Sequence, residues 1–138
     1  MKTRIPQAIA LIAGIMLWAG TAQAQMIEVI AGSPTTCPGD TQVVVPVTTT
    51  NFNGVAGLSL TMLIDTNIIK FQDYVNVHPG LAGGTLLINS PAPGTTVKIA
   101  WFSLMAVNLG NAKILDLRFK FKGGTGNLTW STLPGDCD

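Results

Sequence analysis

Residues 57–65 read Gly-Leu-Ser-Leu-Thr-Met-Leu-Ile-Asp, and this stretch decides the fold class. Its apolar side chains occupy every second position: Leu58, Leu60, Met62 and Ile64. Successive side chains of a β-strand point to opposite faces of the sheet, so these four predict one buried face. The side chains between them are predicted to line the opposite, accessible face: Gly57, Ser59, Thr61 and Leu63.

The same alternation recurs on both sides of this stretch, with no segment of helical spacing beyond the first two dozen residues. In 96–104, Val97, Ile99 and Trp101 are predicted to face inward and Phe102 outward. Further strands are predicted at 26–31, 41–50, 68–75, 85–89, 113–121 and 127–131. Glycine, proline, asparagine and aspartate separate them. The pattern of about eight short strands favours an all-β fold, either a β-sandwich or a jelly roll.

Pro46 lies inside the predicted strand 41–50. Proline has no backbone N–H to donate to a neighbouring strand. We therefore expect this strand to lie at a sheet edge or to carry a bulge at Pro46.

The first 24 residues have the three parts of a secretory signal peptide. Lys2 and Arg4 give a positive start, residues 8–18 form an apolar run, and Ala22-Gln23-Ala24 provides a cleavage site after Ala24. The run is shorter than the roughly 20 residues of a membrane span, and no second run follows. We expect an exported protein, secreted or at the cell surface, with one domain at 25–138 and no membrane span.

The charge balance excludes a nucleic-acid partner. The chain has 8 lysine and arginine and 7 aspartate and glutamate residues. Removing Lys2 and Arg4 leaves a net charge of −1, whereas nucleic-acid binding needs a basic patch.

Cys37 and Cys137 are the two cysteines of the chain. Export would place them in an oxidising compartment, which favours a disulfide between them. Pairing requires their Cα atoms to lie within about 7 Å, so two unpaired thiols remain the alternative.

Reactive side chains are too scarce to indicate an enzyme, and we expect no catalytic residue, cofactor or metal. Glu28 is the single glutamate and His78 the single histidine, which leaves a zinc site short of ligands. Asp65-Thr66-Asn67 lacks the glycine and distal glutamate of a calcium loop, so a plain turn is expected.

Five segments in order resemble a cohesin domain. They are the run from Gly39-Asp40 into 43–47, the segment 54–60, the turn at Asp65 into 68–71, the strand 97–101 and the late strand 114–120. Together they extend over nearly the whole chain after residue 25.

The resemblance implies a jelly roll that binds a dockerin-type protein module through one sheet face, often in extracellular polysaccharide-degrading assemblies. Carried over by strand register, that partner-binding face would hold eight residues: Gly57, Ser59, Thr61, Leu63, Ala100, Phe102, Asp116 and Arg118. Two features depart from the family. Asp65 is followed by Thr66 instead of proline, and the sequence stops at Asp138, about where a closing strand is expected.

Two alternatives remain open: a carbohydrate-binding module on a related jelly roll, which would bind a polysaccharide, and a structural domain of the adhesin type. Sugar-binding modules present several exposed aromatic rings. Here Trp101 is in phase with the core and Phe102 alone is predicted to be exposed on its strand. One aromatic ring among small and apolar side chains is typical of a protein interface.

Overall fold

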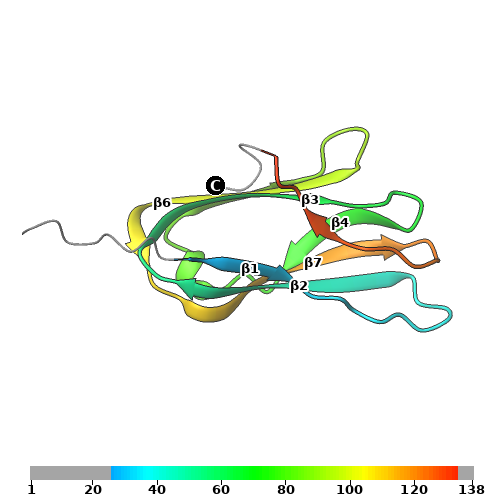
Figure 1. Cartoon of the computed structure of the whole chain (residues 1–138), viewed down its shortest axis with the longest axis horizontal. Helices are drawn as coiled ribbons and strands as arrows, with labels where there is room; N and C mark the ends of the chain where they lie inside the picture. Colours follow the sequence, from blue (N-terminus) through cyan, green and yellow to red (C-terminus); the bar gives the residue numbers. More distant parts are fainter. Residues whose placement is uncertain (1–25, 134–138) are drawn as a thin grey trace, which may run out of the picture.

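Residues 26–133 of this computed structural model are described here, and they form two packed antiparallel sheets (Figure 1). The predicted signal peptide and Cys137 lie outside these residues. The strands are β1 Glu28–Ala31, β2 Gln42–Phe52, β3 Val55–Leu63, β4 Ile69–Val75, β5 Thr85–Asn89, β6 Thr96–Val107, β7 Gly110–Phe121 and β8 Thr129–Trp130. A single 3-10 turn, η1, covers Pro79–Leu81. The predicted all-β sandwich is confirmed.

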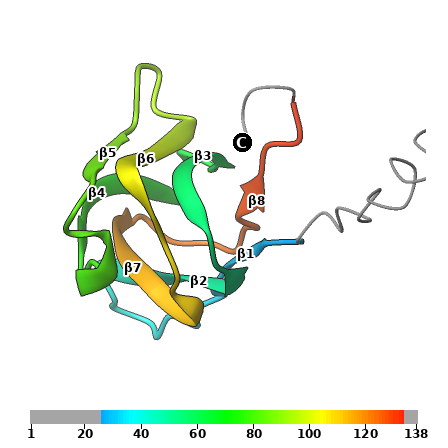
Figure 2. The ribbon, with the colours of Figure 1, turned by 90° about the vertical axis from the view of Figure 1, so that its left-hand side faces the viewer.

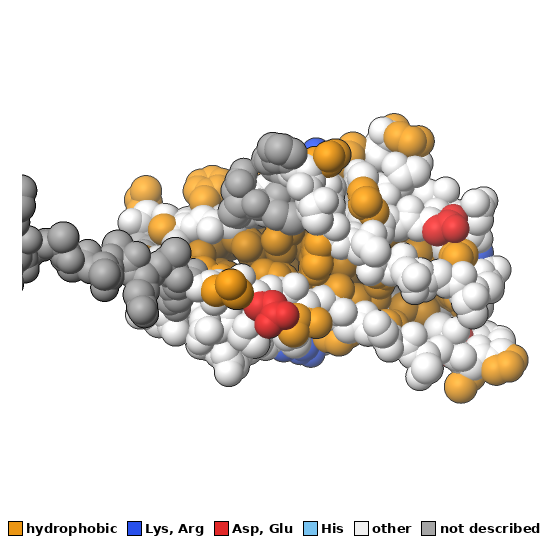
Figure 3. All heavy atoms as spheres, viewed as in Figure 1, with side chains coloured by type: hydrophobic (Ala, Val, Ile, Leu, Met, Phe, Trp, Pro, Cys, Tyr) orange, Lys and Arg blue, Asp and Glu red, His pale blue; other side chains and the backbone are white. Residues whose placement is uncertain are grey.

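Each of the two layers of the sandwich is one four-stranded sheet. We call the order β1-β2-β7-β4 sheet 1 and the order β5-β6-β3-β8 sheet 2. Figure 2 shows the layers end on, with β1 and β8 at one side of the sandwich and β4 and β5 at the other. Seen from the side in Figure 3, hydrophobic side chains gather in a band between β1 and β3.

The core between the sheets follows the alternation of the sequence. Leu60 and Met62 are buried on the inner side of β3, Ile64 is buried just beyond its end, and Leu58 packs against the core. From the other sheet, β7 contributes Leu115, Leu117 and Phe119, each with no exposed area. The predicted inward face of β3 is confirmed.

Trp101 anchors this core and is 2% exposed. Its indole N–H donates to the carbonyl of Leu81 at 3.1 Å. The centroid of its ring lies 6.4 Å from the ring centroid of Phe52. The hydrogen bond satisfies the one polar group of the buried indole, and it holds η1 against sheet 2.

Of the two alternatives expected for the strand that contains Pro46, the edge position is wrong, because β2 lies between β1 and β7. Pro46 is tolerated because β1 ends at Ala31, opposite Val47. The carbonyl of Pro46 accepts the N–H of Gly32 at 2.8 Å. The missing N–H of proline points to the same side, where the pairing of β1 has already ended. The β2–β7 ladder shifts register one residue later, between Val47 and Thr48.

No helix within residues 26–133 is long and apolar enough to cross a membrane.

Candidate functional site

Six of the eight predicted partner-binding residues lie on the paired strands β3 and β6 of sheet 2. In the β3–β6 ladder, Gly57 pairs with Phe102 and Ser59 with Ala100, while Leu63 pairs with Thr96. On the other side of β6, Leu87 of β5 pairs with Ala100. We call the following set the sheet 2 face: Gly57, Ser59, Thr61, Leu63, Thr85, Leu87, Asn89, Lys98, Ala100 and Phe102.

Apolar side chains on this face remain in contact with solvent. Phe102 is 56% exposed, Leu87 60% and Leu63 42%. The ring of Phe102 lies between Gly57, which has no side chain, and Thr85. The predicted exposure of Phe102 is confirmed, and the face combines an aromatic ring with neighbouring aliphatic groups.

Leu87 was not recognised from the sequence, although the alternation in 85–89 carried the signal. Its outward position becomes relevant only once β5 is known to pair with β6.

Leu104 and Met105 were missed because they lie where β6 departs from regular pairing. Between the pairs of Gly57 with Phe102 and of Val55 with Val107, β6 has more residues than β3. Such a bulge pushes side chains outward, and Leu104 and Met105 are fully and 78% exposed.

Thr61 differs from the expectation of an accessible side chain, since it is only 5% exposed. It pairs with Lys98 on one side, and its carbonyl accepts the N–H of Ser131 at 2.8 Å on the other. Thr61 is therefore flanked on both sides, whereas the neighbouring Ser59 is half-buried.

The structure separates Asp116 and Arg118 from the other six predicted residues. Both lie on β7, which pairs with β2 and β4 in sheet 1. The expectation of one common face for all eight residues is therefore wrong. Alternation along a strand tells which side chains share a face of that strand, but not to which sheet the strand belongs.

Asp116 is buried in a small polar cluster on sheet 1. Its Oδ2 accepts hydrogen bonds from Lys113 Nζ and Asn76 Nδ2, each at 2.8 Å. A bulge makes this possible: Val47 pairs with Leu115 and Thr48 with Lys113, so Ile114 is the extra residue. The bulge puts Lys113 on the same face as Asp116. The hydrogen bond from Lys113, followed by that from Asn76, holds the pKa of Asp116 below its usual value.

Arg118 forms a two-pronged ion pair with Asp73 of β4 through Nε and Nη2. Asp73 lies opposite Arg118 because Gln72 is an extra residue in the β4–β7 ladder. The hydrogen bonds lower the pKa of Asp73 and raise that of Arg118. Because the donors of Arg118 are directed at Asp73, the pair fits a role in joining β4 to β7.

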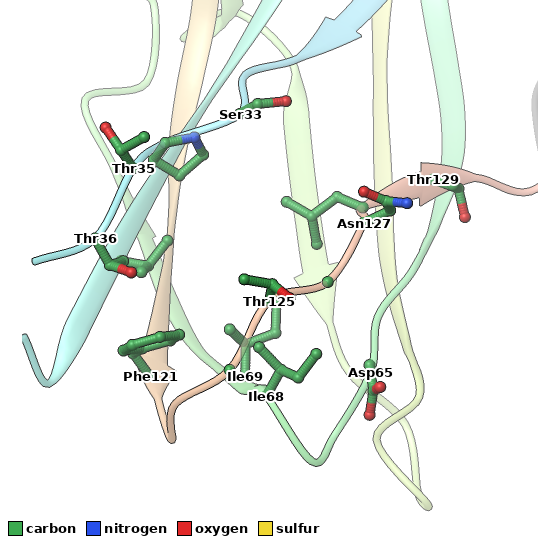
Figure 4. Close-up of a pocket in the computed structure, with 15 residues that line it drawn as sticks. Ser33, Thr35, Thr36, Asp65, Ile68, Ile69, Phe121, Thr125, Asn127 and Thr129 are labelled. Atoms are coloured by element: carbon green, nitrogen blue, oxygen red, sulfur yellow. The ribbon is translucent and has the colours of Figure 1, made fainter. Parts of the chain in front are cut away.

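A cleft of about 580 Å³ opens at the end of the sandwich where β1 leads into β2 (Figure 4). Ser33, Thr35 and Thr36 lie along one wall, and Thr125, Asn127 and Thr129 along the other. Its apolar floor consists of Val43, Ile68, Ile69, Phe121 and Leu128.

Asp65 is the one charged residue among those that line this cleft. Its Oδ1 accepts the N–H of Asn67 at 2.9 Å, and its carbonyl accepts those of Ile68 and Ile69. The predicted plain turn at 65–67 is confirmed. The lining can form hydrogen bonds, but it contains no nucleophile paired with a base.

The remaining groups with possible chemistry have structural contacts. His78 Nδ1 accepts the N–H of Gly80 at 3.0 Å and caps η1. No group of three histidine, cysteine, aspartate or glutamate side chains in residues 26–133 is placed to hold a metal ion. Cys37 is exposed and has no disulfide partner within these residues. Its pairing with Cys137 stays a prediction.

Solved structures provide the comparison, since no family model matches the chain and no curated protein matches it in sequence. A type I cohesin–dockerin complex from Clostridium thermocellum aligns with a TM-score of 0.62 at 14% identity, over 78% of this chain and 80% of that one. The seventh ScaB type I cohesin from Pseudobacteroides cellulosolvens aligns with a TM-score of 0.59 at 16% identity, over 76% and 73%. A non-cellulosomal cohesin from the hyperthermophilic archaeon Archaeoglobus fulgidus gives a TM-score of 0.57 at 16% identity, over 80% and 81%.

The chain has the cohesin fold. This confirms the two-layered all-β architecture that the sequence resemblance implied. At these identities the likeness shows the fold alone.

Proposed function

We propose that this protein is a non-catalytic, extracellular cohesin-type module that binds dockerin-bearing proteins, in the context of polysaccharide degradation. The exposed apolar surface on the sheet 2 face carries the proposal: Phe102, Leu87 and Leu63 lie on the same side of three neighbouring strands. Interface cores combine such aromatic anchors with small and aliphatic neighbours.

The rigidity of the platform supports the same function. β6 lies between β3 and β5, so Ala100 and Phe102 are fixed by ladders on both sides. Trp101, between them, is held in the core by its hydrogen bond to Leu81. A preformed surface loses little side-chain freedom on binding, and this favours affinity.

A dockerin-bearing protein is the partner that we propose, because some of the structurally similar proteins were solved in complex with dockerins. One of them is a type I cohesin–dockerin complex from Clostridium thermocellum, which matches the fold of this chain. The predicted signal peptide at 1–24 supports export.

Substitution of Phe102 by alanine tests the proposal. A dockerin-bearing partner would be isolated on the immobilised protein from the culture medium of the source, and its affinity measured by surface plasmon resonance. We expect Phe102→Ala to weaken binding about tenfold, since an interface anchor contributes more than about 1 kcal/mol. Val44→Ala is a matched control, because Val44 is 42% exposed on the outer side of sheet 1.

Carbohydrate binding is the alternative that the same experiment separates. The purified protein would be applied to cellulose or xylan without any partner protein. Retention that Phe102→Ala weakens would show carbohydrate binding and contradict the proposal of a protein partner. Trp101 is buried and Trp130 packs against the core. The face therefore has a single exposed ring in residues 26–133, which favours a protein partner.

A further inference from the structure

Lys98 is the one charged side chain on the sheet 2 face. It is exposed on β6, and no acidic or basic residue of β3, β5 or β8 shares that face in residues 26–133. The ladders place neutral Thr61 and Asn89 directly beside it. No hydrogen bond or ion pair joins the side chain of Lys98 to another residue of the described chain.

Within residues 26–133, the first acidic residue that follows Thr61 along the chain is Asp65, in the turn after β3. Asp65 lies four residues beyond Thr61, the ladder partner of Lys98, which corresponds to about 13 Å along a strand. Charges exposed to solvent at this separation are largely screened at physiological ionic strength. Asp65 therefore does not neutralise Lys98.

Apolar side chains surround Lys98 diagonally. Leu63 is two residues beyond its partner on β3, and Leu87 is two residues before its partner on β5. A partner that covers Leu63 and Leu87 must also remove water from the ammonium group between them. An ammonium group buried without an anion is strongly unfavourable.

We propose that Lys98 determines the charge specificity of this face, and that it selects a partner module with an aspartate or glutamate placed between two apolar contacts. This inference rests on the proposed function. It adds that the attractive contact at the centre of the interface is a carboxylate on Lys98, and that a partner with a basic side chain at that position is rejected.

A dockerin module displayed on yeast with its surface positions randomised is a suitable probe. It would be selected in parallel against the wild-type protein and against Lys98→Glu. We expect wild-type binders to share an acidic residue at one position and Lys98→Glu binders to share a basic residue there. A wild-type binder should lose about tenfold or more in affinity toward Lys98→Glu. Exchange of its acidic residue for lysine should restore binding to that variant.

Lys120→Glu is the matched control, since Lys120 is exposed on the outer side of sheet 1 and pairs with Gln42 and Lys70. Binders should tolerate this change. If Phe102→Ala abolishes binding while Lys98→Glu does not alter it, the inference is wrong and the proposed function stands. If binders are insensitive to both changes, or none is enriched, the proposed function fails as well.

Discussion

Gly57 of β3 lies directly opposite Phe102 of β6 in the antiparallel ladder of sheet 2. Without a side chain at position 57, one flank of the aromatic ring is open, and this explains why more than half of Phe102 is accessible. A Cβ atom added to Gly57 would meet only the carbonyl oxygen of Trp101, at 3.8 Å. Gly57 is therefore not required by backbone packing.

Gly57→Val should separate binding from stability. Valine suits a strand better than glycine, so the free energy of unfolding should stay the same or rise by up to about 1 kcal/mol. Its methyl groups would cover the flank of Phe102 and weaken partner binding. Urea unfolding and surface plasmon resonance measure the two effects. Unchanged affinity together with unchanged stability would remove this flank from the interface.

Gly84 has the opposite character, because the chain passes close to Trp101 there. A Cβ atom at position 84 would lie 2.5 Å from both the carbonyl oxygen of Phe102 and the indole nitrogen of Trp101. Gly84→Ala should lower the free energy of unfolding by about 1–3 kcal/mol, as overpacking of a core does. Gly83→Ala is the matched control, since a Cβ there meets nothing within 4 Å. Equal stability of the two variants in urea unfolding would contradict this account of η1 and β5.

Arg118 provides a test of whether only sheet 2 takes part in partner binding. It lies on sheet 1, and its donors are directed at Asp73. Arg118→Ala should therefore leave the affinity for a dockerin-bearing partner unchanged within about twofold, while Phe102→Ala lowers it. A large loss with Arg118→Ala in surface plasmon resonance would show that sheet 1 contributes to the interface.

The alternation of apolar residues was enough to predict the inner and outer faces of β3 and β6, because a period of two is a property of each strand alone. It could not predict the extra residues Gln72 and Ile114, since a bulge is defined only against a paired strand. Without these bulges, neither Asp73 beside Arg118 nor Lys113 beside Asp116 is foreseeable. The same limit applies to the candidate face: the residues on β3 and β6 could be predicted, but the assignment of β7 to the other sheet could not.

Asp116 makes folding depend on pH. Hydrogen bonds from Lys113 and Asn76 lower its pKa in the folded protein, whereas the unfolded chain keeps a value of about 3.9. The folded state therefore favours the charged carboxylate. This contribution is fully present above pH 4 and is lost as the pH falls through the lowered pKa.

Asp116→Asn should remove that dependence, because an amide does not titrate in this range. Thermal unfolding followed by circular dichroism would be recorded for both proteins between pH 7 and pH 2. We expect the wild-type protein to have the higher Tm at pH 7, and the difference to shrink below pH 4 as its carboxyl group is protonated. Asp73 also has a lowered pKa, so the variant should retain part of its acid sensitivity through the pair with Arg118. A difference in Tm that stays constant over the whole range would mean that the cluster around Asp116 stabilises the fold by packing and not by charge.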